Sequence, residues 1–479
     1  MSRPTRRSML ACAAALATTA AGLMLSLAAG ASAKTFVVTK RADPVPDACK
    51  KRDCSLREAV LAANARPGKD VIELPNRRRP YNLARAGSDE DGALDGDLDI
   101  ANHALVVKHP GKGRATVDAN GIERVFEVFA GAPTTFRKLV IRGGNNATSG
   151  SEGGGIRSEA NLRVIRSRIV GNESDSSHGG GIGLQSGAGL TLVRSVVRGN
   201  RAPIHDGGGI DGDQGPMVVV RSVIAQNTAG DDGGGIYFLS DDGSRIEKST
   251  IAGNRAEGDA GGINVTGGAT DSGLRLIGST VSRNRSAVNG GGITVHSPLR
   301  VTNSTLASNR ADGSGGGIYY GISDPMVKLN GVTVARNVAD ADADATGAGG
   351  GLYRASMNGV LDAFAVENSL LGLNRLGSGQ RNDCDGLAID SLGHNLVSTL
   401  GPAGACQRFG PPAPKDIVNK NPRIGKLKRN GGPTQTIALR KRSPAINKAK
   451  RSTAPKRDQR GVKRKRKRDI GAYERNVNR

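Results

Sequence analysis

The stretch that decides the fold of this chain begins with Gly233-Gly234-Gly235-Ile236 and continues to Ser249-Thr250-Ile251-Ala252-Gly253-Asn254. Both landmarks recur from about residue 140 onward. The glycine run that ends in an aliphatic residue occurs at 153–156, 179–182, 207–210, 233–236, 290–293, 315–318 and 349–352, with a shorter copy at 261–263. Its aliphatic ends lie 26, 28, 26, 27, 30, 25 and 34 residues apart, and this near-constant period indicates a solenoid.

Each period contains short, mostly apolar β-type stretches such as residues 190–197, separated by glycine corners and without helical periodicity. Short strands joined by tight turns predict an all-β, right-handed parallel β-helix of about ten coils. Coils about 4.8 Å apart would make a rod of roughly 50 Å. The chain lacks the leucine spacing that is typical of a leucine-rich repeat, and it lacks the tryptophans that are typical of a propeller.

The composition agrees with a solenoid. Of 479 residues, 69 are glycine without a G-X-Y period, which excludes collagen. The hydrophobic fraction of 37% is too high for a disordered polymer. Because only 3% of residues are aromatic, we expect a core of Val, Ile, Leu and Ala.

The second landmark places an asparagine at one corner of each coil. These asparagines are Asn172, Asn200, Asn227, Asn254, Asn284, Asn309 and Asn337, with Asn374 as a more distant candidate. Stacked at one corner, each amide could donate to a neighbouring carbonyl and accept from another backbone group. Because buried polar groups need partners, we expect a structural ladder rather than ligand-binding amides.

The N-terminus has the features of an export signal, which we assign to residues 1–33. Arg3, Arg6 and Arg7 precede an apolar run over residues 9–29, and Ala31-Ser32-Ala33 fits an A-x-A cleavage site. The arginine pair also resembles a twin-arginine signal, and an uncleaved anchor helix is the alternative. We therefore expect a secreted or cell-surface protein, with no membrane-spanning segment in its mature part.

Four cysteines remain after the signal, namely Cys49, Cys54, Cys384 and Cys406. An even number in an exported chain favours disulfides over metal ligands. Three pairings are possible, and closeness in sequence favours Cys49–Cys54 with Cys384–Cys406. A zinc site is the weaker interpretation, since no histidine lies near either pair.

A solenoid needs a cap, and residues 34–68 are our candidate for the N-terminal one. Ser55-Leu56-Arg57-Glu58 is a capping box, and Leu56, Val60 and Ala63 would share one face of the helix it begins. We assign residues 69–375 to the β-helix repeats and 376–479 to an irregular C-terminal region with a basic tail.

At its front, the chain resembles a known family. Cys54-Ser55-Leu56-Arg57-Glu58-Ala59 is similar to the signature of the bacterial CSLREA domain, found on exported parallel β-helix proteins. The C-terminal part resembles the region called choice-of-anchor Q, through Asn430-Gly431-Gly432-Pro433-Thr434-Gln435-Thr436 and Asp469-Ile470-Gly471-Ala472-Tyr473-Glu474. The repeats are also similar to those of polymorphic outer membrane proteins, which are adhesins. These resemblances imply a surface or secreted architecture without an established reaction.

The charge is concentrated at the C-terminal end. Without its first 33 residues the chain carries +21, and residues 415–479 alone carry +19. Six consecutive cations occur there, namely Lys463, Arg464, Lys465, Arg466, Lys467 and Arg468. Such a run predicts contact with an anionic envelope polymer or polysaccharide, and a solvated loop is the alternative. No motif indicates specific recognition of nucleic acid.

Alignment of the coils on the aliphatic residue after each glycine run gives a polar column four residues before it. The column contains Glu152, His178, Asp206, Asp232 and Asp259, and Asp211 and Asp213 lie close by. Carboxylates stacked so closely must hold a cation, share protons or accept backbone N–H groups. We expect the last, a capped turn. A calcium site and a hydrolytic pair are the alternatives for the candidate row Asp206, Asp211, Asp213, Asp232 and Asp259.

We therefore predict an exported, noncatalytic, adhesin-like β-helix protein that binds a surface or matrix polymer. We assign no catalytic residue and no cofactor, with calcium as the exception to be tested, and we expect a monomer. The alternative is a polysaccharide lyase or glycoside hydrolase of the pectate-lyase-like β-helix class, which rests on fold analogy.

Overall fold

The structure is a computed structural model, and it describes residues 32–475 apart from several short gaps. The gaps are residues 76–77, 88–90, 148–151, 186, 240–242, 268–272, 322–325, 356–363, 401–405, 407–408 and 410–414. The predicted export signal therefore falls almost wholly outside the described residues.

Burial alternates along the strands, and this alternation creates the core. In β18 (Met217–Val220), Met217 and Val219 are buried while Val218 and Val220 are half-exposed. The strands of successive coils pair in parallel and in register, so Leu192, Val219 and Ile246 stack inside the rod. Because each inward side chain lies over its equivalent, a continuous core of Ile, Val and Leu runs along the axis.

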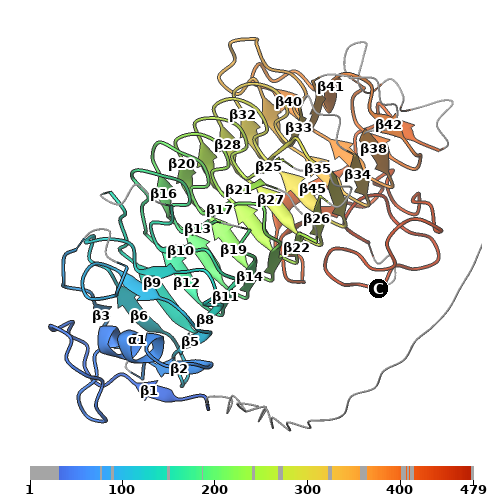
Figure 1. Cartoon of the computed structure of the whole chain (residues 1–479). Coiled ribbons are helices and arrows are strands. Elements are labelled where there is room, and N and C mark those ends of the chain that lie inside the picture. Colours follow the sequence, from blue (N-terminus) through green and yellow to red (C-terminus); the bar gives the residue numbers. More distant parts are fainter. Residues whose placement is uncertain are drawn as a thin grey trace, which may run out of the picture.

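Three long parallel sheets and one short parallel sheet form the wall of the rod (Figure 1). The first sheet contains β1 (Thr35–Val37), β2 (Asp70–Glu73), β5 (Leu105–Lys108), β8 (Thr134–Arg137), β11 (Leu162–Ile165), β14 (Leu190–Val193), β18, β22 (Arg245–Glu247), β26 (Leu274–Ile277), β30 (Leu299–Thr302), β34 (Val327–Asn330), β38 (Phe364–Glu367) and β42 (Asp390–Ser391). The second sheet contains β4 (Leu98–Ile100), β7 (Phe126–Val128), β10 (Ile156–Ser158), β13 (Ile182–Leu184), β17 (Ile210–Gly212), β21 (Ile236–Leu239), β25 (Ile263–Thr266), β29 (Ile293–Val295), β33 (Ile318–Tyr320), β37 (Leu352–Arg354) and β41 (Cys384–Gly386).

The other two parallel sheets meet at the asparagine corner. The third sheet contains β3 (Tyr81–Asn82), β6 (Ala115–Asp118), β9 (Leu139–Arg142), β12 (Arg168–Val170), β15 (Val196–Arg198), β19 (Val223–Ala225), β23 (Thr250–Ala252), β27 (Thr280–Ser282), β31 (Thr305–Ala307), β35 (Thr333–Ala335), β39 (Leu370–Gly372), β43 (Leu396–Val397) and β44 (Ile417–Val418). The fourth sheet contains β16 (Arg201–Ala202), β20 (Thr228–Ala229), β24 (Arg255–Ala256), β28 (Arg285–Ser286), β32 (Arg310–Ala311), β36 (Val338–Ala339) and β40 (Arg375–Leu376). This topology confirms the predicted parallel β-helix of about ten coils.

Two polar ladders hold neighbouring coils together at the corners. Asn200 donates from its backbone N–H and its Nδ2 to Oδ1 of Asn227, at 3.0 and 3.1 Å, and the same pattern continues along the rod. A second ladder of buried serines precedes the third sheet, where the N–H of Ser195 donates to Oγ of Ser222 at 3.1 Å. Both ladders satisfy backbone groups that no water reaches.

The glycine corner requires glycine for two reasons. Gly233 has φ +65°, a left-handed conformation that side chains disfavour. At the next residue, a Cβ on Gly234 would overlap the carbonyl oxygen of Arg255 in the following coil. The run thus combines a turn with close packing between coils.

The helix α1 (Leu56–Asn64) lies across the N-terminal end of the rod. Ser55 Oγ accepts the N–H of Glu58, and the Glu58 carboxylate accepts the N–H of Ser55, so the capping box is formed. Leu56, Val60 and Ala63 are buried together. No helix in the described part of the chain has the length and apolar character needed to cross a lipid bilayer.

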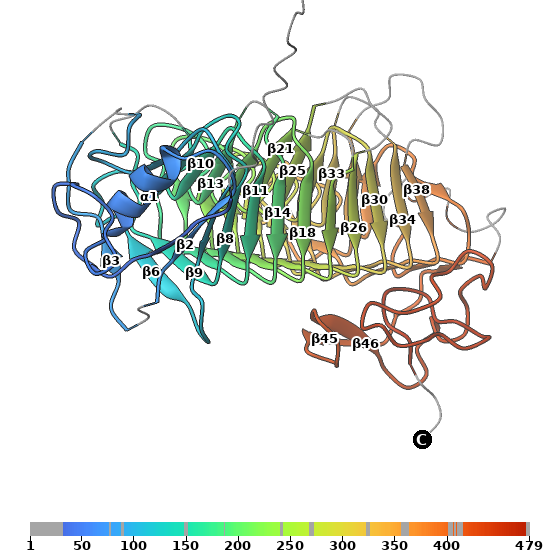
Figure 2. The ribbon, with the colours of Figure 1, turned by 60° about the horizontal axis from the view of Figure 1, so that its bottom comes forward.

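The C-terminal region folds back along the outside of the third sheet (Figure 2). Its hairpin pairs β45 (Ile424–Lys428) with β46 (Thr436–Leu439), and Ile437 and Leu439 pack with Ala307 and Ala335 of the rod. Coils continue past residue 375, because β43 and β44 still join the third sheet. The structure contains the disulfides Cys49–Cys54 and Cys384–Cys406.

Candidate functional site

The polar column ahead of the glycine runs forms a ladder of its own. Oδ1 of Asp206 accepts the N–H of Asp232 at 2.8 Å, and Oδ1 of Asp232 accepts the N–H of Asp259 at 2.6 Å. Oδ1 of Asp259 in turn accepts the N–H of Asn289 at 2.7 Å. One oxygen of each aspartate therefore caps a backbone group of the next coil.

The second oxygens meet in a crowded, half-buried environment. Oδ2 of Asp232 accepts an amide hydrogen of Asn264, with Oδ2 and Nδ2 2.8 Å apart. Burial, followed by the charge of Asp259, raises the pKa of the Asp232 carboxyl to about 7, although the Asp259 N–H opposes this shift. Burial likewise raises the pKa of Asp259. Around neutral pH, Asp232 is therefore divided between its protonated and charged forms.

His178 lies next to Asp206 and Asp211. Its Nδ1 is 3.4 Å from Oδ2 of Asp206 and 3.7 Å from Oδ2 of Asp211. The hydrogen bond to Asp206 raises the pKa of His178. Burial, together with the negative charge of Glu152, raises the pKa of Asp211 well above its ordinary value. Oδ2 of Asp211 is buried and accepts no hydrogen bond among the described residues.

The structure thus brings together some, but not all, of the residues of the candidate row. Asp206, Asp232 and Asp259 stack in one column, and Asp211 joins Asp206 through His178. Asp213 contributes charge to Asp211 and Glu152 without a direct contact between these groups in the described structure. Asn264 was not predicted to belong to this site, although its position directly after the inward-facing Ile263 could have indicated it.

Asp206, Asp231 and Asp232 could offer one oxygen each to a cation, since these atoms lie within 4.8 Å of one another. Calcium prefers six to eight oxygen ligands. Here Asp206 and Asp232 each commit one oxygen to a backbone N–H, and the other oxygen of Asp232 accepts from Asn264. The donor set fits a turn cap better than a calcium cage.

We predict that Asp232→Asn is more stable than the wild type, and that the difference in the free energy of unfolding grows from pH 4 to pH 7. The unfolded carboxyl has a pKa of about 3.9, whereas the folded one is raised, so the native state binds more protons in this window. The wild type therefore loses stability as pH rises through the folded pKa, and the asparagine variant does not. Thermal unfolding at several pH values measures the difference.

The matched control for this prediction is Asp231→Asn, which removes an exposed carboxylate next to Asp232. An equal rise in the control would contradict the assignment to Asp232. Stabilisation of the wild type by calcium, lost in either variant, would instead establish a cation site.

The six-cation run divides into two groups. Lys463, Lys465, Arg466 and Lys467 are exposed. Arg464 is buried and donates to Glu474 Oε2 at 3.1 Å and to the carbonyl of Asp469 at 2.7 Å. Arg468 is half-buried and donates to the carbonyl of Ala454. Four side chains are therefore available to a partner.

Charges of one sign cluster at separate places on the rod. The acidic column lies beside the second sheet, whereas the first sheet presents four stacked cations in register on consecutive coils. These are Arg245, Arg275, Arg300 and Lys328, and all are exposed. A rod with a small net charge thus carries local clusters of each sign.

Comparison with known proteins finds one structural likeness. No family model and no curated protein matches the chain. Among solved structures, it is similar to the crystal structure of the pectate lyase Pel9A, with a TM-score of 0.45 and 13% identity. The match covers 93% of this chain and 97% of that one. The resemblance to the CSLREA and choice-of-anchor Q families stays a prediction.

Proposed function

We propose that this protein is an exported, noncatalytic β-helix protein of adhesin-like type. It binds an anionic polymer of the cell envelope through residues 415–475, its basic C-terminal region. The rod provides a rigid scaffold, and the basic region provides long-range attraction to the polymer.

The observation that supports the proposal is that the basic C-terminal region exposes its cations and not its acids. Eighteen of its 22 Lys and Arg side chains are exposed. Its four acids turn inward: Asp458 pairs with Arg460, and Glu474 pairs with Arg464. Asp416 accepts the N–H of Asn395, and Asp469 accepts the N–H of Asn447. The outer surface is therefore almost purely cationic.

A polysaccharide lyase or hydrolase is the second candidate, and one observation favours it. His178 and the Asp211 carboxylate beside it are titratable groups with raised pKa values in a partly buried cluster. Such clusters occur at catalytic sites and also in structural ion networks. The neighbouring aspartates cap backbone groups, which supports the structural role.

The test removes the four exposed cations of the run and leaves Arg464 in place. We expect Lys463→Gln, Lys465→Gln, Arg466→Gln and Lys467→Gln together to elute from purified cell envelope at clearly lower salt than the wild type. If all four contact the polymer, the slope of log affinity against log salt should fall by about 3.

The matched control changes Arg245, Arg275, Arg300 and Lys328 to glutamine, which removes the same charge from the rod. We expect this variant to elute close to the wild type. Identical elution of the wild type and the tail variant would refute attachment through the run. Release of unsaturated or reducing ends from the envelope glycan, abolished by His178→Ala, would show that the protein is an enzyme.

A further inference from the structure

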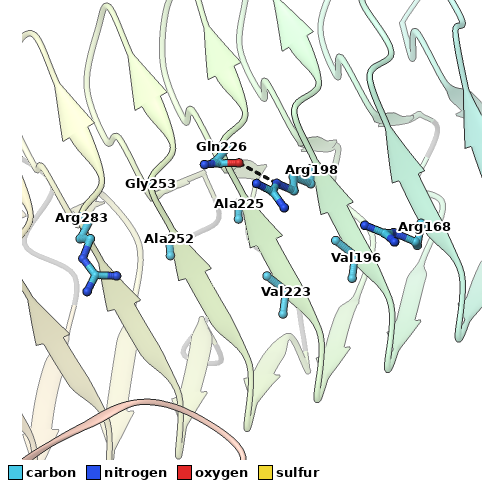
Figure 3. Close-up of a pocket in the computed structure, with 9 residues that line it drawn as sticks. All are labelled: Arg168, Val196, Arg198, Val223, Ala225, Gln226, Ala252, Gly253 and Arg283. Carbon is cyan, nitrogen blue, oxygen red and sulfur yellow. Dashed lines mark hydrogen bonds between the residues drawn. The ribbon is translucent and has the colours of Figure 1, made fainter. Parts of the chain in front are cut away.

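A shallow trough lies on the outer face of the third sheet, near the middle of the rod (Figure 3). Its volume is about 410 Å³. The residues that line it are Arg168, Val196, Arg198, Val223, Ala225, Gln226, Ala252, Gly253 and Arg283. They come from five consecutive coils, from β12 to the turn after β27.

The floor of the trough is apolar although it faces solvent. Arg168, Val196 and Val223 occupy the same outward register position on three successive strands. Val223 is 37% exposed, and Ala225 and Ala252 continue the floor. The solvated face of a sheet ordinarily carries polar side chains, so an apolar floor indicates a contact surface.

Arginines surround this floor without acidic partners. Within the described residues, no carboxylate lies at ion-pair distance from Arg168, Arg198 or Arg283. Nε of Arg198 donates to Oε1 of Gln226 at 2.6 Å, which orients its guanidinium over the trough. Arg114 adds a further cation close to Arg168: burial and then the charge of Arg168 lower the pKa of Arg114.

The corner next to the trough is also basic. Arg166, Arg194, Arg221 and Lys248 occupy one turn position in consecutive coils, and all have φ between 49° and 52°. This conformation favours glycine or asparagine. The following coils indeed have Gly278, Asn303 and Gly331 at this turn, where the C-terminal region packs: Thr434 donates to the carbonyl of Gly278, and Asn303 donates to that of Arg457. Cations occupy the strained position only where the corner is open.

The trough continues into the basic C-terminal region. Thr280 donates to the carbonyl of Gln435 at 2.6 Å, and Thr280 belongs to the coil that carries Arg283. The loop between β45 and β46 therefore adjoins one end of the trough, and it carries the exposed Arg429. An extended anionic ligand in the trough could reach both surfaces.

We propose that the trough binds a linear acidic polysaccharide lying along the axis of the rod. The apolar floor would contact the C–H faces of sugar rings, while Arg168, Arg198 and Arg283 would pair with carboxylates. None of the nine described residues that line the trough is aromatic, so they offer no stacking platform for nucleic acid bases. The inference takes its ligand class from the proposed function, but it assigns a different site.

The test measures binding of a galacturonate hexamer to the full chain at low salt by calorimetry. We expect the triple variant Arg168→Gln, Arg198→Gln, Arg283→Asn to bind about tenfold more weakly, because three exposed ion pairs are lost. Asparagine is used at Arg283 because its φ is 56°. The matched control, Arg245→Gln with Arg275→Gln and Arg300→Gln, should bind within about twofold of the wild type.

Two further measurements separate a saccharide site from diffuse attraction. Val223→Ser should weaken binding of the hexamer, and the fully methyl-esterified hexamer should bind poorly to every variant. Equal losses in the trough and control variants, or binding of a thymidine hexanucleotide as tight as that of the galacturonate, would overturn the proposal. The tail variant from the elution experiment should retain hexamer binding, so failure of envelope attachment and failure of the trough are distinguishable.

Discussion

Arg57→Ala is expected to lower the free energy of unfolding by about 3–5 kcal/mol, because it leaves a buried carboxylate without its partner. Arg57 is fully buried, and its Nε and Nη2 donate to the two oxygens of Asp43 at 2.8 and 2.9 Å. Its guanidinium also donates to the carbonyls of Ala93, Asp95, Gly96 and Asp97. One side chain thus joins the cap helix, the entering chain and the first complete coil.

Chemical denaturation monitored by circular dichroism measures this loss. Arg41→Ala is the matched control, since Arg41 is exposed in the same segment, and we expect it to change stability by less than about 0.5 kcal/mol. Arg57→Lys keeps the charge but not the planar fork, so it should fall between the two. A stability of Arg57→Ala equal to that of the control would mean that the cap does not depend on this network.

The repeats made the fold predictable because every coil repeats the same physical constraints. A glycine run marks a turn against the next coil, and the aliphatic residue after it points inward, so Ile210, Ile236 and Ile263 stack in register. Alignment of the repeats was enough to predict parallel pairing, the asparagine corner and the column of Asp206, Asp232 and Asp259.

The serine ladder was not predicted from the repeats. Ser222, Ser249 and Ser279 recur at the repeat distance, but serine is common at turns, and its hydroxyl has no distinctive spacing of its own. The position of the C-terminal region against the rod could not be predicted from the sequence either, because it depends on tertiary contacts. Nε2 of Gln459, for example, donates to the carbonyl of Ser279, 180 residues away.

The basic run illustrates the same limit at the level of the site. Six consecutive cations look equivalent in sequence, yet Arg464 is buried by Asp469 and Glu474, which the local loop brings around its guanidinium. Likewise, the small net charge of the rod did not indicate that four cations stack on the first sheet and three aspartates stack beside the second. The face on which a charged side chain lies depends on its position within the coil, so the net charge of the rod does not indicate where the charges cluster.

Asn227→Ala is expected to lower the free energy of unfolding by about 3 kcal/mol, since it removes a link from the middle of the asparagine ladder. Oδ1 of Asn227 accepts the N–H and Nδ2 of Asn200, and its Nδ2 donates to the carbonyl of Val197 and to Asn254. Alanine would leave several of these buried groups unpaired.

Hydrogen exchange should place the loss within the solenoid, because each coil contacts only its neighbours. In Asn227→Ala, we expect faster exchange at the N–H of Asn200, whose acceptor is lost, and unchanged protection in distant coils. Gln226→Asn is the matched control: residue 226 is an exposed amide at φ 55°, where asparagine is tolerated, and it lies next to the ladder without joining it. Unchanged stability and exchange in Asn227→Ala would mean that strand pairing alone holds the coils together, and the buried asparagine corner would then be dispensable.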